Sequence, residues 1–288
     1  MIAAGLALAL VSAFALNWAF FRQHDAASGL PPLSLRRPLA SLRALFGSPR
    51  WLLGFSVGIA GWAAYVAALR LAPLSLVQAT AAGGIGVLAL LVRAAGTPLS
   101  RRESIGVIWS VAGLAALGVS LAGGAAAGST ASAAAVAAWC VASAAAAGIS
   151  AGPLARALAP GAGLGIAAGV LYAAGDVATK QAVAGGAELA FVPVLLACHG
   201  LAFVALQLGF QRGGALATAG VATLATNALP ILAGTTLFGE GLPDGPLGVV
   251  RLLAFGAVVA GAAAIAGRGG ERERAPRLTA TAAARTID

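Results

Sequence analysis

The chain has 288 residues, of which 60% are hydrophobic and only 9% are charged, with a formal net charge of +9. Soluble domains carry roughly 25% charged residues, so this composition excludes a soluble fold. Apolar runs of about 20 residues recur along the chain, which is the length a helix needs to cross the hydrocarbon core. The runs are continuous rather than alternating, which excludes a transmembrane β-barrel. The sequence therefore predicts an all-α polytopic membrane protein.

Nine transmembrane helices are predicted, at 2–21, 51–70, 73–93, 104–123, 132–150, 162–183, 189–210, 215–238 and 246–267. With the N-terminus outside and the C-terminus inside, fifteen of the eighteen basic residues fall on one side. Cytoplasmic loops carry such an excess of Arg and Lys, so this sorting supports both the count and the orientation. We expect a multi-pass protein of the cell inner (cytoplasmic) membrane, and no nucleic-acid partner, because the positive charge is accounted for by membrane topology.

The first cytoplasmic loop, 22–50, contains a segment with helical spacing of apolar residues, SLRRPLASLRALFG at 34–47. Leu35, Leu39, Leu42 and Phe46 fall on one face, and such a basic amphipathic segment is typical of an anionic membrane surface. The alternative is an ordinary basic loop in which Pro38 breaks any helix. The tail, 268–288, has no apolar periodicity and is predicted to be disordered.

Two blocks of the chain align when it is shifted by 142–143 residues. IGVIWSVAG at 105–113 falls on LGVVRLLAF at 247–255, and 72–86 falls on 215–229. The predicted domains are a first four-helix repeat at 1–123, a linking helix within 124–161, a second repeat at 162–267 and the tail. An odd span between equal blocks inverts the second block. Inverted repeats of this 4+1+4 kind place a site near the midplane of the membrane.

Three stretches carry a resemblance to a known family: WLLGFSVGIAGWAAYVAALRLAPLSLVQ, GTPLSRRES and FGEGLPDGPLGVV. They resemble the drug/metabolite transporter superfamily, most of all EamA-like proteins and their NIPA-type branch, which was named for magnesium transport. The likeness covers about residues 1–267 and implies an inverted-repeat carrier with a central cavity. The chain departs from the pattern in two ways. Thr97 stands where the second repeat has Glu240, and nine spans replace the ten of many EamA-like members.

Corresponding interrupted segments in the two halves of a transporter indicate its substrate site. The residues of interest are Gln78, Thr80, Gly83, Gly84 and Gly86 in the third span, and Thr223, Asn227 and Pro230 in the eighth. Glycine allows close approach or an opening of the backbone, and proline frees a carbonyl to face a cavity. The alternative is tight helix packing through small residues.

One pair of charged residues, Asp176 and Lys180, lies inside the sixth span. A charged residue within a membrane helix costs about 2.5–3.5 kcal/mol on insertion scales and faces the bundle interior. Two interpretations stay open. Asp176 could accept a proton or a substrate cation and release Lys180 during transport, or Lys180 could extend to the outer surface while Asp176 offsets its charge.

Other candidate residues lie nearer the ends of the spans. Arg70 and Arg251, with Glu240, could form an outer vestibule, although isolated basic residues extending to the surface explain them equally well. His199 and Asn17 could line a cavity, and a histidine bonded to a neighbouring carbonyl is the alternative for His199. The sequence contains no P-loop, zinc-ligand spacing or nucleophile–base set, so we expect no cofactor, no resident metal and no catalytic residues.

The sequence therefore favours a secondary transporter, not an enzyme, that moves a small metabolite or drug by alternating access. Its expected partners are the lipid bilayer, a small-molecule substrate and protons as a candidate coupling ion, and self-association stays open. The first alternative is a NIPA-type divalent cation (magnesium) transporter. The second is a non-transporting membrane protein that binds lipid or assists assembly.

Overall fold

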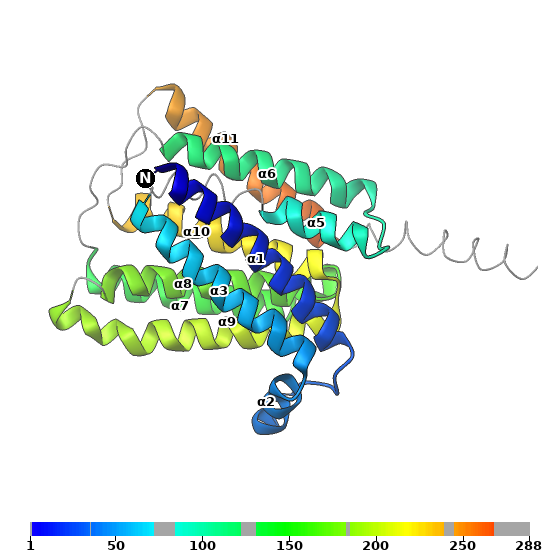
Figure 1. Cartoon of the computed structure of the whole chain (residues 1–288). Helices are drawn as coiled ribbons and strands as arrows, with labels where there is room; N and C mark the ends of the chain where they lie inside the picture. The colour runs from blue at the N-terminus through cyan, green and yellow to red at the C-terminus, as the bar shows by residue number, and fades with distance from the viewer. Residues whose placement is uncertain are drawn as a thin grey trace, which may run out of the picture.

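The computed structural model describes residues 2–34, 36–71, 84–121, 131–182, 185–238 and 245–267. Within these ranges the secondary structure is helical, apart from one isolated antiparallel bridge between Leu158 and Gly267. The elements, drawn in Figure 1, are α1 (Ile2–Ser28), α2 (Pro38–Phe46), α3 (Pro49–Leu71), α5 (Gly84–Ala94), α6 (Arg101–Leu121), α7 (Ala133–Ala151), η1 (Leu154–Ala157), α8 (Ala162–Ala182), η2 (Gly186–Phe191), α9 (Val192–Arg212), η3 (Leu216–Gly220), α10 (Val221–Leu237) and α11 (Pro246–Ala266).

Seven helical segments of the described chain are long and apolar enough to cross a membrane: Ala3–Ser28, Arg101–Ser120, Ala133–Ala151, Ala162–Ala182, Gly186–Arg212, Leu216–Gly234 and Pro246–Ala266. The protein is thus an all-α multi-pass membrane protein, as predicted. The predicted span 51–70 coincides with α3, a helix of 23 residues. Of the predicted span 73–93, the described residues include only those from Gly84, in α5. The count of nine, the repeat and the orientation stay predictions.

Small residues bring the helices together in antiparallel pairs. A side chain added at Gly58 or Gly61 of α3 would contact α1 at Ala19 or Ala15. In the same way, α6 packs on α11, because Gly106 lies against Ile265 and Gly113 lies against Ala254 and Val258. Membrane helices associate through such close van der Waals packing, since lipid offers no hydrophobic driving force between them.

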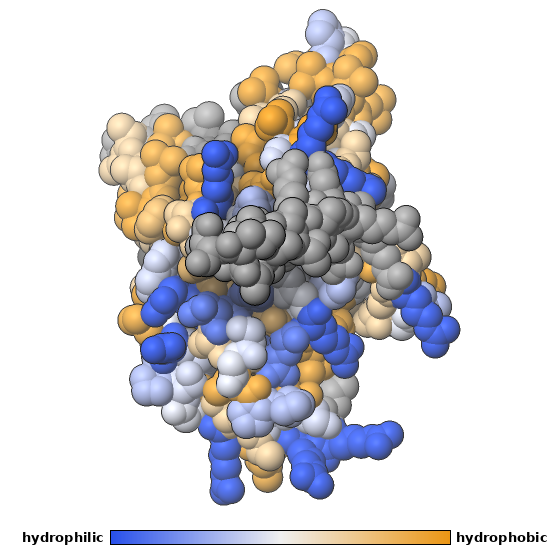
Figure 2. Space-filling view, turned by 90° about the vertical axis from the view of Figure 1, so that its right-hand side faces the viewer, coloured by the Kyte–Doolittle hydropathy of each residue, from blue (hydrophilic) through white to orange (hydrophobic). Residues whose placement is uncertain are grey.

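The basic residues gather at one end of the bundle, which we call the basic end. Contacts that place helix ends together there include Ala159 N to Ala266 O at 2.7 Å and His24 Nε2 to Gly213 O at 2.8 Å. The arginines that lie on or beside these helix ends are Arg22, Arg36, Arg37, Arg43, Arg50, Arg93, Arg101, Arg102, Arg156 and Arg212. Figure 2 views this end and shows hydrophilic side chains across it. The opposite end is where α8 ends and α11 begins.

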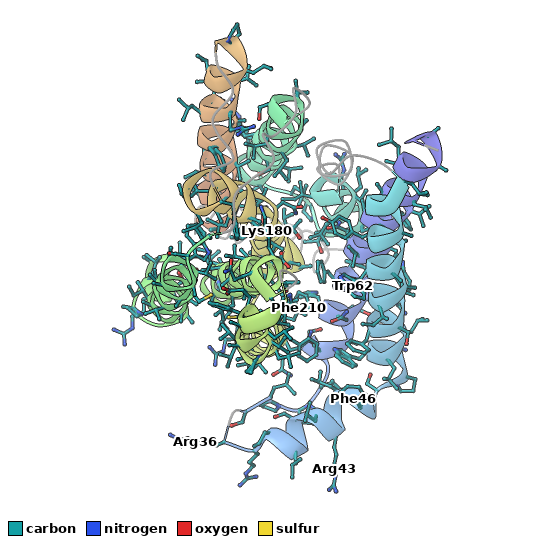
Figure 3. All side chains as sticks on the ribbon, turned by 90° about the vertical axis from the view of Figure 1, so that its left-hand side faces the viewer. Arg36, Arg43, Phe46, Trp62, Lys180 and Phe210 are labelled. Atoms are coloured by element: carbon teal, nitrogen blue, oxygen red, sulfur yellow. The ribbon has the colours of Figure 1, made fainter. Side chains whose placement is uncertain are left out.

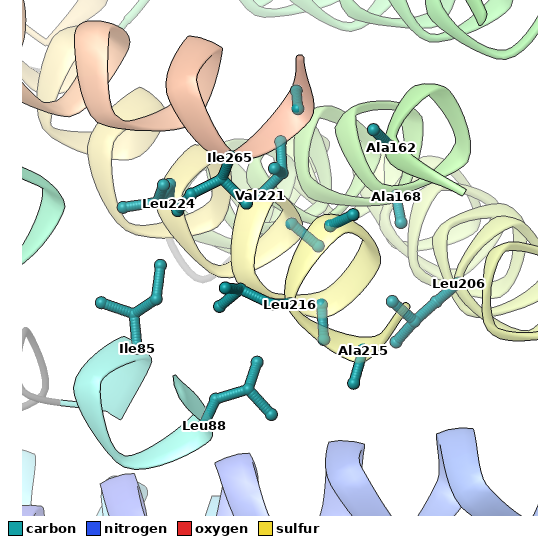
Figure 4. Packing of buried hydrophobic residues seen from close by; sticks show 14 of the residues in the cluster. Ile85, Leu88, Ala162, Ala168, Leu206, Ala215, Leu216, Val221, Leu224 and Ile265 are labelled. Atoms are coloured by element: carbon teal, nitrogen blue, oxygen red, sulfur yellow. The ribbon is translucent and has the colours of Figure 1, made fainter. Parts of the chain in front are cut away.

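The largest cluster of buried apolar side chains joins the two halves of the chain. Ile85 and Leu88 of α5 face Leu216 in η3 and Leu224 in α10 (Figure 4). The segment η3 is a single π-helical turn whose five residues are all buried, and such turns occur often at functional sites. The most buried of the candidate spans is α8, which lies between α7, α9 and α10. Its polar residues are therefore positioned by packing on several sides.

Candidate functional site

Asp176 lies in α8, about 21 Å along the helix from its start at the basic end and about 9 Å from its other end, at 1.5 Å per residue. Its neighbours Gly175 and Val177 are buried, yet 46% of the Asp176 side chain is exposed. A carboxylate at this depth is therefore accessible although the helix that carries it is mostly enclosed. That combination is expected of a binding site rather than of a packing residue.

The ion-pair partner of Asp176 is His199 of α9, with 3.5 Å between the imidazole Nε2 and the carboxylate Oδ1. The other ring nitrogen, Nδ1, is bonded at 2.9 Å to the carbonyl oxygen of Leu195. A carbonyl oxygen only accepts hydrogen bonds, so Nδ1 carries a hydrogen and donates it. The proton that titrates is therefore the one on the Nε2 side, facing Asp176. Asp176 and His199 form a pair that can share a single proton.

The imidazole can lie this close to α8 because residue 175 has no side chain. A Cβ added at Gly175 would overlap with the Nδ1 and Cε1 atoms of His199. Tyr172, one turn earlier on α8, contacts the same ring edge-to-face, with 5.7 Å between ring centroids. Tyr172 and Gly175 were not predicted from the sequence.

Lys180 is placed differently from the expected one-turn pair. Its Nζ lies 4.0 Å from the centroid of the Phe238 ring, a cation–π contact with the end of α10. Lys180 lies in the last turn of α8, at the opposite end of the bundle. Among the described residues, Asp176 forms its ion pair with His199 and not with Lys180. The arrangement separates the permanent charge of the lysine from the accessible carboxylate.

At the basic end, three buried side chains join the two halves of the chain. Trp51 of α3 donates from Nε1 to Oε1 of Gln207 in α9 at 2.8 Å. Gln207 then donates from Nε2 to Oε1 of Gln23 in α1 at 2.9 Å. Trp51 is 0%, Gln207 2% and Gln23 5% exposed. We call these three residues the glutamine seam. The indole N–H of Trp51, both polar atoms of the Gln207 amide and the amide oxygen of Gln23 thus have hydrogen-bond partners. Because these buried groups are paired, the contact between the helices at the basic end is stable.

Aromatic rings pack around the glutamine seam and exclude water. Trp51 stacks on Phe55 with 5.1 Å between centroids, and Phe203 of α9 contacts both rings edge-to-face. Phe46 of α2 covers Trp51 from the other side at 5.2 Å. Trp51 is fully buried among these rings. Glutamines near the ends of two apolar spans were the available signal for this seam.

Asn17 and Thr226 each contact a glycine of another helix. Asn17 of α1 is buried against Gly84, with Nδ2 donating to the Ala13 carbonyl at 2.8 Å. Within the described part of the chain its Oδ1 has no hydrogen-bond partner. In the second half, Thr226 donates to the carbonyl of Gly169 at 3.4 Å. Both contacts join the first helix of a half to its third.

The other predicted residues of the eighth span lie in α10. Asn227 donates to the carbonyl of Thr223 at 2.7 Å, and the buried hydroxyl of Thr223 has no hydrogen-bond partner among the described residues. Pro230 lies inside the same helix, and its ring removes the donor that would otherwise bond to the carbonyl of Thr226. In the third span, Gly86 is described in α5, where a side chain at this position would contact Val111 of α6. Gln78, Thr80 and Gly83 lie outside the described residues.

Arg251, a predicted vestibule residue, is 2% exposed. It donates from Nε to the hydroxyl of Ser120 at 3.2 Å and from Nη2 to the Ser120 carbonyl at 3.1 Å. Ser120 lies in the last turn of α6, so the guanidinium binds the negative end of that helix. The side chain of Arg70 and the whole of Glu240 lie outside the described residues, so their expected convergence with Arg251 stays a prediction.

The described residues contain no group of three or more His, Cys, Asp or Glu side chains that could together hold a metal ion. An ion at Asp176 would therefore keep most of its water ligands. Two polar constellations stand out in the described chain: the accessible Asp176–His199 pair near the opposite end and the buried glutamine seam at the basic end.

The many apolar helices indicate a multi-pass membrane protein, and the Asp176–His199 ion pair joins two of them. The comparison with known proteins agrees. The chain is 26% identical over 249 residues to a protein of Arabidopsis thaliana named "Probable magnesium transporter NIPA9", and the alignment covers 78% of this chain and 70% of that one. This likeness fits the resemblance to the NIPA-type branch and the expectation that the chain is not an enzyme. The resemblance to EamA-like proteins stays a prediction. No family model and no solved structure matches the chain.

Proposed function

We propose that the protein is a secondary transporter of the cytoplasmic membrane that moves a small metabolite or drug by alternating access. A cationic group of the substrate and a proton compete for the Asp176–His199 pair. The observation that carries this proposal is a deep carboxylate, 46% exposed, whose ion-pair partner is itself titratable. A cation that binds Asp176 displaces the shared proton, which couples the two movements.

The two ends of the bundle differ in the way that alternating access requires. Near the opposite end, Asp176 is accessible, whereas at the basic end the glutamine seam and Phe210 are almost completely buried. With the basic end on the cytoplasmic side, this is a state open to the outside and closed to the inside. Transport then requires the seam to open while the path to Asp176 closes.

An inverted repeat supports the same proposal. Gly84 and Thr226 are separated by 142 residues, the shift that aligns the two halves of the sequence. Gly84 packs on Asn17 of α1, and Thr226 bonds to Gly169 of α8, so the third predicted span of each half contacts the first. Asn17 and Gly169 lie 152 residues apart, so only the helices correspond and not the positions on α1 and α8. The antiparallel packing of α6 on α11 is the arrangement expected of equivalent helices related by an inverted repeat.

Magnesium is the second candidate substrate, and the likeness to the plant protein favours it. Mg²⁺ retains several water molecules and binds through one or two carboxylates. A single accessible Asp176 could therefore bind a hydrated ion without a further carboxylate ligand. In this case the ion would displace the same proton from the pair.

The purified protein in liposomes tests both candidates. Proton, Mg²⁺ and drug fluxes are followed with trapped indicators in the wild type, in Asp176→Asn and in the control Asp25→Asn, whose carboxylate is exposed at the basic end. We expect Asp176→Asn to abolish coupled flux and Asp25→Asn to retain it. Loss of a Mg²⁺ flux alone selects the second candidate. Equal fluxes in wild type and Asp176→Asn contradict the assigned site.

A non-transporting role is tested with the same preparation. If no metabolite, drug, proton or Mg²⁺ flux occurs, and a specific lipid stays bound through purification, the lipid-binding alternative replaces the transporter proposal. A chain that transports should also lose flux when the seam is locked. The pair Gln23→Cys and Gln207→Cys, oxidised to a disulfide, should stop transport, and reduction should restore it.

A further inference from the structure

We propose that the outward face of α2 binds anionic phospholipid headgroups of the leaflet at the basic end, and that this attachment keeps the glutamine seam covered. The helix begins at Pro38, which occupies the first turn, where its missing N–H costs nothing. The alternative that Pro38 breaks a helix in this loop is therefore wrong. The residues on the two faces of α2 differ in what they contact.

The face of α2 turned away from the bundle is apolar and exposed. Leu39 is 74% exposed, whereas Leu42 and Phe46 are 44% and 47% exposed at the edge of this face. Leu42 also lines the cavity between α2 and α9, and Phe46 also contacts Trp51. Leu45, on the other side, is 3% exposed. The exposed parts of these three apolar side chains are stable where lipid covers them, since an amphipathic helix with nearby basic residues lies in the membrane interface.

The charge of the segment selects an anionic surface. Arg36 and Arg37 lie at the start of α2, Arg43 lies in its last turn and Arg50 follows it. The sequence contains no Asp or Glu between Asp25 and Glu103, so no acidic residue within the segment itself offsets these charges. Figure 3 shows Arg36 and Arg43 at the outer edge of the structure, with Phe46 nearer the bundle.

Hydrogen bonds hold the start of α2 in a fixed shape. The hydroxyl of Ser41 donates to the Ser34 carbonyl at 3.1 Å and accepts from the Ser34 amide at 2.9 Å. The Ser34 hydroxyl also accepts from the amide of Arg36 at 3.2 Å. The basic residues are thus presented from a folded segment rather than from a loose loop, so that lipid binding acts on the whole helix.

The inward face of α2 covers the glutamine seam. A cavity of about 130 Å³ lies between α2 and α9, and its lining includes Leu45, Phe203 and Gln207. Phe46 contacts Trp51 directly. A force that holds α2 against the bundle therefore also holds water away from the Trp51–Gln207 hydrogen bond. This second half of the inference rests on the proposed opening of the seam during transport, whereas lipid binding by α2 does not.

The lipid contact is measured without any transport assay. A fluorophore is attached to Leu39→Cys in a background with Cys140→Ala and Cys198→Ala, and the protein is placed in phosphatidylcholine vesicles with or without phosphatidylglycerol. Quenching by nitroxide-labelled lipid reports insertion. Each arginine strengthens attachment to an anionic surface about fivefold, so three arginines contribute roughly 100-fold. We expect more quenching with phosphatidylglycerol, and a loss of the difference at high salt, where charges are screened within about 3 Å.

The matched variants change the same number of charges at the same end. Arg36→Gln/Arg37→Gln/Arg43→Gln should remove the effect of phosphatidylglycerol, and Arg93→Gln/Arg101→Gln/Arg156→Gln should retain it. Quenching that ignores lipid charge in the wild type, or that falls equally in both triple variants, overturns the inference. The salt dependence of the wild type decides the matter even if a variant does not fold.

The coupling to the seam has its own measurement. Val204, which lines the cavity between α2 and α9, is replaced by Cys and labelled with a membrane-impermeant reagent added on the basic side. The triple variant of α2 should be labelled faster than the control variant. Lipid-dependent quenching at Leu39 together with unchanged labelling at Val204 would retain the lipid site and reject its coupling to the seam. Absence of flux in liposomes, by contrast, would reject the transporter and leave the quenching result intact.

Discussion

The glutamine seam makes a quantitative prediction about which end of the protein is open. Gln207→Leu retains the approximate volume of the side chain but removes both hydrogen bonds, so the indole N–H of Trp51 and the amide oxygen of Gln23 are left buried without partners. Each such group costs about 1–3 kcal/mol, which gives about 2–6 kcal/mol against the state closed at the basic end. Even the lower value shifts the population of that state about 30-fold.

The assay is labelling of a single cysteine at Ala225, in the middle of α10, by an impermeant reagent added on the basic side. We expect Gln207→Leu to accelerate labelling by at least about 30-fold, until the open state predominates. Gln181→Leu is the matched control, because Gln181 is equally buried but bonds to Ala131 and Glu188 at the opposite end. It should lower thermal stability without exposing Ala225 to the basic side.

A third variant separates hydrogen bonding from packing. Replacing all three members of the seam, with Trp51→Phe, Gln23→Leu and Gln207→Leu, leaves no buried polar group unpaired, so most of the closure should return. Labelling in Gln207→Leu that equals the wild-type rate, or that matches Gln181→Leu, would refute the reasoning that the seam is a state-dependent closure.

Three further substitutions test other contacts. Gly175→Ala should displace the His199 ring and reduce coupled flux, whereas the control Gly200→Ala, which has open space around it, should not. Arg251→Met should lower the free energy of unfolding by about 1–3 kcal/mol, seen as a lower Tm, because the Ser120 carbonyl loses a buried donor. Replacing Gly261 by Ala should also lower Tm, since its side chain would overlap with the α6 backbone. Unchanged flux in the first case, or unchanged Tm in the other two, contradicts the contact concerned.

The sequence predicted the helices well, because a membrane span can be identified from the composition of its own residues. Apart from 73–93, each predicted span coincides with a helix of the structure. The ion-pair partner of Asp176 was harder to predict. Lys180 is evident at one-turn spacing in the same helix, whereas His199 is positioned by the packing of α9. Gly175 allows this contact, because its missing side chain leaves space for the His199 ring. The role of Gly175 depends on the position of His199, which cannot be derived from the sequence alone.

The hydrogen bonds that join the buried polar side chains of the glutamine seam could not be predicted from the sequence either. Trp51, Gln207 and Gln23 are far apart in the chain, and hydropathy treats each as a local interruption of an apolar run. For Arg251, a snorkelling side chain and a helix cap have the same sequence signature, and the position of Ser120 on α6 decides between them. Local patterns specify elements, whereas the partners of buried polar groups depend on tertiary packing.

The partners of the charged residues explain why Asp176 is the best candidate for coupling. Arg251 and Arg102 bind carbonyls near the ends of α6 and α11, so each permanent cation is stabilised by the fixed partial charge of a helix end. Asp176 is paired instead with an imidazole, whose charge changes near neutral pH. A permanently charged partner would hold the carboxylate neutralised through the whole cycle. A titratable one lets the net charge of the pair change by one proton when a cation arrives, and a site that exchanges a cation for a proton requires that change.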